Sequence, residues 1–284
     1  MLPLGKLVVY PHVVLPLAIS DPRAVQLLDD VVEGDKRLLL GVVRPRENRD
    51  PDEGPVMDAV PDDLYAIGTL SLVVRMLKLV DGSMRVMIQG VDRVELRDPQ
   101  PLGGWLSAGF ELLPTLGADD PRVEALKRNV VAQFGRVIDL APYLADELHE
   151  VLAGITDPGK LADFVAANLD LALPAKAELL SLGDIPRRLE RLAVLLAEEL
   201  QVLEVGSQIQ EKVKAKLDEH QREYVLREQL RVIRQELGEE ASEDELQDLA
   251  TKLDGAGLST EARRVSDREL KRLRQMSPQS AEYH

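Results

Sequence analysis

The chain has 284 residues, of which 45% are hydrophobic and only 3% aromatic, so its cores must be built from aliphatic side chains. That length allows two domains, or one domain with an extension. Fifty acidic residues against 35 basic ones give a net charge of −15, which argues against non-specific nucleic-acid binding because such binding needs a basic surface. Cysteine is absent, which excludes disulfides and thiol catalysis and suits a cytoplasmic protein.

The beginning of the chain does not have the pattern of a targeting segment. No apolar block follows a basic stretch, and prolines at positions 3, 11 and 16 interrupt the first apolar residues. We therefore expect neither a signal peptide nor a membrane span. Asparagine occurs only at positions 48, 129 and 168, and this scarcity of a thermally labile residue suggests a thermophilic source.

The first forty residues alternate short apolar runs with turn residues. Leu7–Tyr10 and Val13–Leu17 are strand-length runs punctuated by prolines, which favours edge or bulged strands. Asp21 followed by proline predicts a helix that ends near Gly34. Leu38–Val43 then predicts another strand, and the proline-rich, charged residues 44–61 predict a mobile loop.

The next segment carries the clearest β signal. The apolar runs Thr69–Val80 and Met84–Leu96 flank Asp81-Gly82, a pair typical of two-residue hairpin turns. Gly90, inside the second run, indicates a bulge or the close approach of another backbone. A further strand is predicted at Trp105–Leu113, and four to six strands with one short helix indicate a small barrel or sandwich.

After position 115 the apolar period changes from that of strands to that of helices. Four helices are predicted, and they begin at Asp120-Pro121, Pro142, Asp157-Pro158 and Pro174. Their apolar faces predict a helical bundle, on which the first turns of the following long helix can pack.

The long helix is the dominant feature of the sequence, running from Pro186 to Gly238 without an internal proline. An apolar stripe from Leu189 to Leu203 recurs every three or four residues, thins after Val205, and returns at Leu226. A continuous helix here is roughly 78 Å long. Its polar middle predicts a spacer that connects two packed domains or pairs with another helix as a coiled coil. Two further helices, one acidic and one basic, are predicted in residues 239–284.

The sequence contains no convincing catalytic or metal-binding motif. Gly154–Leu161 resembles a phosphate-binding loop, but Leu161 stands where Ser or Thr would bind magnesium and Asp157 would repel a phosphate. A turn between helices, capped by Asp157, is the favoured interpretation. The four histidines share no ligand spacing, and no Gly-x-Ser-x-Gly turn occurs, so we expect no metal site and no catalytic residues.

The polar middle of the long helix carries ordered charges. Asp218–Arg222 and Glu223–Arg227 are acidic-before-basic pairs four residues apart, which support an exposed helix. Two interpretations stay open: a solvated single helix, or pairing with another copy that covers the apolar side chains there.

The 27 residues from Lys212 to Gly238 closely resemble the long-helix signature of Lon, the ATP-dependent protease of bacterial type. Three other stretches resemble the N-terminal region of that family: Val9–Leu17, Ile67–Leu70 with Asp81–Gly90, and Leu161–Asn168. The departures are Leu217 and His220, where methionine and serine are expected, and Gly5-Lys6 in place of an Arg-Asp type of pair.

The resemblance implies an α+β fold: an N-terminal β-rich pseudobarrel (PUA-like), a helical bundle, and one very long, partly coiled-coil helix. On this basis the expected domains are residues 1–115, 116–185, 186–238 and 239–284. The family continues into an ATPase module that uses ATP and magnesium, and then a protease with a serine–lysine dyad. We expect both outside this chain, which resembles a truncated substrate-recognition region with no cofactor of its own.

The function implied is non-catalytic: binding of unfolded or damaged protein substrates through apolar surface, and support of a homohexamer of the full-length parent in the cytoplasm. The candidate substrate-binding residues are Tyr10, Pro11, Val13, Val14, Leu226 and Leu230, and the candidate assembly residues are Leu217, Tyr224, Ile233 and Leu237. Ordinary barrel core is an alternative for the first four, and packing between helices for Leu226 and Leu230. Alternatives for the whole chain are a stand-alone scaffold of this N-terminal type, or a barrel that binds nucleic acid.

Overall fold

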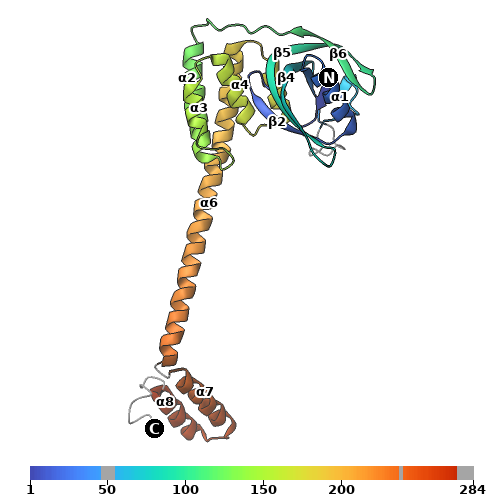
Figure 1. Ribbon diagram of the computed structural model, residues 1–284. Coiled ribbons are helices and arrows are strands. Elements are labelled where there is room, and N and C mark those ends of the chain that lie inside the picture. The colour runs from blue at the N-terminus through green and yellow to red at the C-terminus, as the bar shows by residue number, and fades with distance from the viewer. Residues whose placement is uncertain (46–54, 237–238, 274–284) are drawn as a thin grey trace. The chain divides into compact units, whose positions relative to one another are not determined.

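The structure is a computed structural model that describes residues 1–45, 55–236 and 239–273 (Figure 1). The chain divides into two compact units, Met1–Ser207 and Gln208–His284, which are described separately below. The domain boundaries expected at positions 115, 185 and 238 stay predictions.

The first unit begins with a mixed six-stranded sheet. Its order is β1-β3-β4-β5-β2, with β6 paired to β5, and only the β1–β3 pair is parallel. The strands are β1 (Leu2–Leu4), β2 (Val14–Ile19), β3 (Arg37–Val42), β4 (Ile67–Lys78), β5 (Met84–Leu102) and β6 (Trp105–Leu112). Since β5 is 19 residues long, it pairs with β2 through its first half and with β6 through its second. The sheet curves around α1 (Pro22–Glu33), which confirms the expected β-rich pseudobarrel (Figure 1).

The β4–β5 hairpin and the role of Gly90 are confirmed, but the turn is longer than the two residues predicted. The Leu79 N–H donates to the Ser83 carbonyl at 2.9 Å, so Val80, Asp81 and Gly82 form the turn. Gly82 in the connecting turn has φ +84, a value that favours glycine, and the Ser83 backbone N–H donates to the Asp81 carboxylate at 2.9 Å. Gly90 lies at a bulge, because Leu70 pairs with Asp92 but Ser71 pairs with Gly90. A side chain at Gly90 would bring its Cβ to 2.2 Å from the Tyr10 carbonyl oxygen, so the backbones approach closely there as well.

The strand predicted at Leu7–Tyr10 is wrong. These residues form an irregular segment in which Val8, Val9 and Tyr10 are buried, and the Thr69 hydroxyl donates to the Val9 carbonyl at 2.5 Å. The apolar run therefore reflects burial between layers rather than pairing in a sheet. Strand β1 was not predicted, because it has only three residues and its pairing partner lies about forty positions later.

The predicted helix after Asp21 is confirmed as α1. The Asp21 carboxylate accepts the Arg23 backbone N–H at 2.7 Å, and Pro22 occupies the first turn. Ala24, Leu27 and Leu28 of this helix are buried in one cluster with the strands. A short 3₁₀ turn, η1 (Pro61–Asp63), precedes β4, and half of the loop predicted at 44–61, residues 46–54, lies outside the described residues.

Four helices follow: α2 (Val123–Leu140), α3 (Leu148–Gly154), α4 (Pro158–Asn168) and α5 (Leu173–Ser181). They form one core with the first turns of α6 (Ile185–Glu236), as predicted. Its completely buried members include Phe134, Leu161, Val165, Leu189, Leu192 and Leu196. The predicted helix start at Pro142 is wrong: residues 141–147 form turns, and α3 begins at Leu148. Here Pro142 follows the end of α2 and helps reverse the chain rather than opening a helix.

Helix α6 is continuous over 52 residues, which confirms the predicted long helix. The end predicted at Gly238 lies outside the described residues. Within the second unit, α7 (Glu239–Gly255) and α8 (Thr260–Leu273) correspond to the acidic and basic helices predicted there. Gly257, with φ +59, lies in the connection between them.

Candidate functional site

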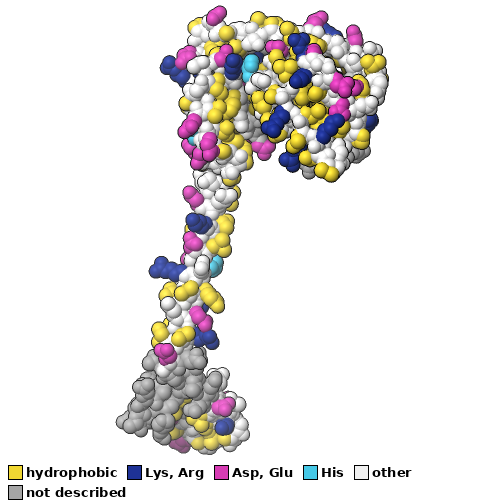
Figure 2. All heavy atoms as spheres, in the orientation of Figure 1, with side chains coloured by type: hydrophobic (Ala, Val, Ile, Leu, Met, Phe, Trp, Pro, Cys, Tyr) yellow, Lys and Arg dark blue, Asp and Glu magenta, His cyan; other side chains and the backbone are white. Residues whose placement is uncertain are grey.

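The first unit contains a cavity of about 740 Å³ that is open to a ligand. One side consists of residues from Leu7 to Leu15, here called the N-terminal wall, and the other of residues from α3 and α4, here called the helical wall. Hydrophobic side chains gather on the face of the unit where α4 and β2 lie side by side (Figures 1 and 2). We call this cavity the groove.

The N-terminal wall is held against β5 by backbone hydrogen bonds. The His12 N–H donates to the Gly90 carbonyl at 2.8 Å, and the Gly90 N–H donates to Val13 at 3.0 Å. His12 has φ 64, a left-handed conformation that turns the chain before β2 begins. As a result Val14 is 48% exposed, Val13 is half-buried and Pro11 is buried.

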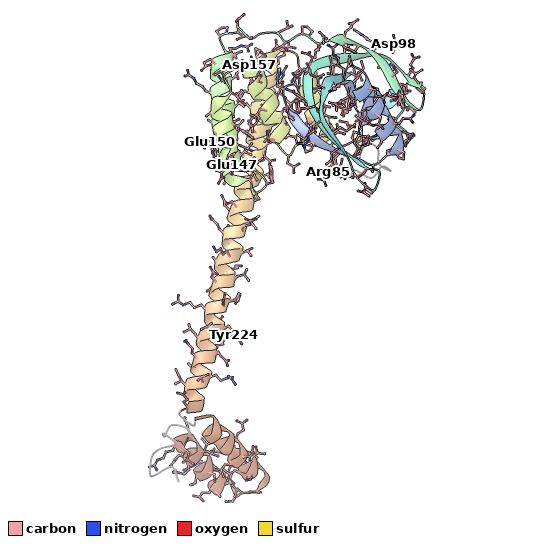
Figure 3. The ribbon with its side chains drawn as sticks, in the orientation of Figure 1. Arg85, Asp98, Glu147, Glu150, Asp157 and Tyr224 are labelled. Carbon is pink, nitrogen blue, oxygen red and sulfur yellow. The ribbon has the colours of Figure 1, made fainter. Side chains whose placement is uncertain are left out.

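The helical wall depends on the turn between α3 and α4. The Asp157 carboxylate accepts the Lys160 backbone N–H at 2.8 Å, which caps α4, and Figure 3 shows Asp157 at the start of that helix. This confirms the turn interpretation of Gly154–Leu161, since a carboxylate already occupies the place where a phosphate would bind. The apolar part of the wall is formed by Val151, Ile155, Phe164 and Ala167.

The groove combines an apolar interior with charged groups of both signs. His12, Asp157 and Lys160 line it and are exposed, whereas Ile155 and Phe164 are half-buried. An apolar surface with a few polar groups at its edge can accept apolar side chains of many shapes. Among the described residues, no group of His, Asp or Glu side chains could hold a metal ion.

The predicted substrate-binding residues near the N-terminus occupy different environments. Tyr10 is fully buried, its hydroxyl donates to the Lys176 carbonyl at 2.8 Å, and burial raises the pKa of the phenol. Pro11 lines the groove but is buried, so only Val13 and Val14 present apolar surface to a ligand. The position of Tyr10 fits the alternative given for it, which is an ordinary core residue. Substrate contact by Pro11, Val13 and Val14 stays a prediction.

The candidate residues on α6 that the structure describes are all exposed. Leu217 is 63% exposed, Tyr224 69%, Leu226 56%, Leu230 52% and Ile233 56%, and Figure 3 shows Tyr224 projecting from the helix. Leu237 lies outside the described residues.

These α6 residues do not share one face. At about 100° per residue, Tyr224 lies within roughly 20° of Leu217, but roughly 180° from Ile233. Ile233 instead lies within roughly 20° of Leu226. The predicted assembly set therefore divides between two stripes. One carries Leu217 and Tyr224, and the other carries Ile233 together with Leu226 and Leu230, the two α6 residues predicted to bind substrate.

Sequence reasoning missed most of the groove and a buried ionic cluster of Arg93, Asp163 and Arg188 beside it. The helical wall could not be matched to the N-terminal wall because more than 130 positions separate them. A signal for the cluster did exist: Asp163 interrupts an otherwise apolar helical run, Leu161–Ala167. A charge in such a run needs a buried partner.

None of the helices in the described part of the chain is both long enough and apolar enough to cross a membrane. The fold is shared with a solved structure, the N terminal domain of Mycobacterium avium complex Lon protease. The TM-score is 0.54 at 19% sequence identity, over 69% of this chain and 95% of that one.

Relatives of known sequence extend the similarity beyond the fold. Lon protease of Dictyoglomus thermophilum is 35% identical over 284 residues, which is 100% of this chain and 35% of that protein. Lon protease of Escherichia coli is 34% identical over 283 residues, with 99% and 35% covered. The chain thus spans about a third of the length of these relatives. The family model of the ATP-dependent protease La (LON) substrate-binding domain matches residues 1–198. This chain belongs to the LON substrate-binding domain family.

Proposed function

We propose that this chain is a non-catalytic region of an ATP-dependent protease, and that it binds unfolded, damaged and regulatory proteins for degradation. The observation that carries the proposal is the groove of about 740 Å³ between the N-terminal and helical walls. It offers apolar side chains from two directions and charged groups at its edge, which can accommodate the apolar side chains of a polypeptide.

An extended polypeptide directs successive side chains to opposite sides. Its apolar side chains can therefore contact Val14 on one wall and Val151 or Ile155 on the other. Each well-buried aliphatic side chain contributes on the order of 1.5–3 kcal/mol, so two or three contacts support a modest affinity. Because such contacts are non-directional, many sequences can use them, which is the property that recognition of unfolded proteins requires.

The exposed stripes of α6 support the second part of the proposal, which is that copies of the chain assemble within a homohexameric parent. Large apolar side chains on an isolated helix leave unfavourable area in water, and another copy can cover it. The proposed parent contains an ATPase module that uses ATP and magnesium. It also contains a protease with a serine–lysine dyad that cleaves the substrate. We propose the cytoplasm as its compartment.

Substrate binding can be tested with fluorescein-labelled, reduced and carboxymethylated lactalbumin, a permanently unfolded probe, by fluorescence anisotropy. Val14→Asp and Val151→Asp each place a charge on one wall at a half-exposed position. We expect at least about tenfold weaker binding for either variant, since a buried carboxylate without a partner costs more than 1.4 kcal/mol.

The matched control is Val80→Asp, because Val80 is fully exposed in the turn between β4 and β5, outside the groove. It adds the same negative charge to the same unit, so it measures general repulsion of an acidic probe. Equal weakening by all three variants contradicts the groove assignment.

Assembly can be tested by light scattering over a range of protein concentrations. Leu226→Glu with Leu230→Glu changes one stripe of α6, and Leu217→Glu with Tyr224→Glu changes the other. We expect a lower average mass for the double variant whose stripe forms the contact between copies of the chain. A mass of one chain for the unchanged protein at all concentrations contradicts assembly through α6.

A further inference from the structure

Four polar side chains meet in the interior of the first unit, between the sheet and the helices. Arg93 of β5 is 5% exposed, Asp163 of α4 2% and Arg188 of α6 1%, and Tyr10 is completely buried. Buried charges are expensive unless paired, so this arrangement needs a physical reason.

The three charged residues form one ionic cluster, here called the joint. Arg93 donates to Asp163 with both Nη atoms, Nη1 to Oδ2 at 3.0 Å and Nη2 to Oδ1, a two-pronged geometry that fixes orientation. Arg188 Nη1 donates to the same Oδ1 at 3.1 Å. One carboxylate on α4 is thus held by guanidinium groups from two other elements.

A single carboxylate does not balance two guanidinium groups, and the remaining negative charge comes from the end of α5. Arg93 Nε donates to the Leu180 carbonyl at 3.0 Å, and Arg188 Nε donates to the Leu182 carbonyl at 2.8 Å. The last carbonyls of a helix lack partners and carry partial negative charge, so they attract cations. Burial, with repulsion from Arg93, lowers the pKa of Arg188 to about 10, so it stays protonated at neutral pH.

The joint lies directly behind the groove. Asp163 belongs to the stretch of α4 whose neighbours Lys160, Phe164 and Ala167 line the groove. Tyr10 adjoins Pro11 of the N-terminal wall, and its hydroxyl bonds to α5 at Lys176. The strand that supports the N-terminal wall through Gly90 is the one that carries Arg93. The two walls are therefore connected through these polar contacts, in addition to the apolar cluster that Val8 and Tyr10 share with α4.

We propose that Arg93, Asp163 and Arg188 are positioning residues that fix the separation of the two walls and so the shape of the groove. The inference rests on the proposed function for its consequence, weaker polypeptide binding, but not for its geometry. An apolar contact would hold the layers together equally well, since well-packed apolar replacements of buried ion pairs are often as stable. What the joint adds is direction, because a two-pronged pair and helix-end carbonyls allow one relative placement.

The experiment measures the wall separation without any ligand. The chain contains no cysteine, so Val14→Cys with Val151→Cys gives two labelling sites, one on each wall and both 48% exposed. Spin labels at these sites report the distribution of distances between the walls by pulsed electron paramagnetic resonance. In this background three changes are compared: Tyr10→Phe, Asp163→Asn, and the triple change Arg93→Met, Asp163→Leu and Arg188→Met.

We expect each variant to broaden or shift the distance distribution, with a smaller change in Tyr10→Phe than in Asp163→Asn. The triple variant should change it too, although it leaves no unpaired charge. Arg191→Met is the matched control, because it removes an exposed guanidinium that pairs with Glu178 between α5 and α6. It should leave the distribution unchanged. Tyr10→Phe loses one hydroxyl and remains folded enough to measure even if Asp163→Asn does not, since one hydrogen bond contributes only about 1 kcal/mol.

A triple variant that is folded, by the fluorescence of Trp105, and shows the original distance distribution would overturn the proposal, as would unchanged distances in both Tyr10→Phe and Asp163→Asn. Binding of the unfolded lactalbumin probe is measured on the same changes made in the chain that keeps Val14 and Val151. We expect at least about fivefold weaker binding wherever the walls have moved, a change of roughly 1 kcal/mol. Moved walls with unchanged binding support the joint and contradict the polypeptide-binding function of the groove.

Discussion

Helix α6 has two parts with the same apolar spacing but opposite environments. In its first turns Leu189, Leu192 and Leu196 are completely buried against the other helices of the first unit. From Val205 to Ile233, every large apolar side chain is exposed. A spacing of three or four residues therefore specifies a helix and a face, but it does not specify whether that face has a partner within the chain.

The two parts also depend on different kinds of interaction. Long-range packing stabilises the first part, where each buried aliphatic side chain contributes about 1.5–3 kcal/mol. The second part depends on the helix propensity of Lys, Glu and Gln and on neighbouring ion pairs, each worth a few tenths of a kcal/mol. Substitutions along α6 and in the first unit should separate these contributions clearly.

The largest difference is expected from one truncation made in each part. Leu192→Ala leaves a cavity in the helical core, and we expect the free energy of unfolding of the first unit to fall by about 2–5 kcal/mol. Leu217→Ala, at an exposed position, should change it by less than about 0.5 kcal/mol. Urea unfolding followed by the fluorescence of Trp105, the single tryptophan, reports the first unit. Similar losses in both variants contradict the comparison.

A pair of glycine substitutions should give effects of opposite sign. Gly90→Ala places a Cβ at 2.2 Å from the Tyr10 carbonyl oxygen, so backbone must move, and we expect a loss of about 1–3 kcal/mol. Gly206→Ala lies in α6, where a Cβ meets nothing within 4 Å, and should stabilise the helix by up to about 1 kcal/mol. The first is measured by urea unfolding and the second by local amide hydrogen exchange. A neutral Gly90→Ala would show that the close approach is easily relaxed.

Sequence patterns predicted the elements whose signals are local, and they failed where distant residues decide. The hairpin at Asp81-Gly82, the cap at Asp157 and the length of α6 all follow from neighbours within a few positions. The run Leu7–Tyr10 was wrongly predicted as a strand, because an apolar run does not tell whether burial comes from strand pairing or from layers above and below.

The candidate site was less predictable than the fold. Val13 and Val14 were named from the sequence, but the helical wall and the joint were not, since both depend on contacts across 70 or more positions. Arg93 was hidden for a further reason. The bulge beside Gly90 shifts the alternation of β5, so a residue expected to point outward is buried.

The Asp21 cap of α1 shows how much a local interaction contributes to the stability of the first unit. The Arg23 side chain, followed by the Arg23 backbone N–H, holds the pKa of Asp21 below its usual value. Because the folded-state pKa is lowered, this carboxylate stabilises the fold above its unfolded pKa, near 3.8, and the contribution is lost as the pH falls through the folded value. We expect Asp21→Ala to cost about 1 kcal/mol at pH 7 and progressively less below pH 4.

Asp21→Asn is the matched control for that prediction. Asparagine retains a side-chain oxygen that can cap α1, but it has no titrating proton. The free energy of unfolding of Asp21→Asn should therefore be nearly equal to that of the unchanged protein at pH 7. As the pH is lowered, Asp21→Asn should become the more stable of the two. Urea unfolding at a series of pH values checks this, and a cost for Asp21→Ala that does not change with pH contradicts the role of the carboxylate charge.

The smallest effect on stability is expected from the Glu223–Arg227 ion pair in the exposed part of α6, which was predicted from the sequence and is present in the structure. Arg227 Nη2 lies 2.7 Å from Glu223 Oε1, and both side chains are more than half exposed. A double-mutant cycle with Glu223→Ala and Arg227→Ala should give a coupling of about 0.2–0.5 kcal/mol, measured by hydrogen exchange of nearby amides. In 1 M salt, where charges are screened within about 3 Å, most of this coupling should disappear. A larger coupling that persists in salt would mean that this part of α6 is covered by another copy, because only a buried pair escapes screening.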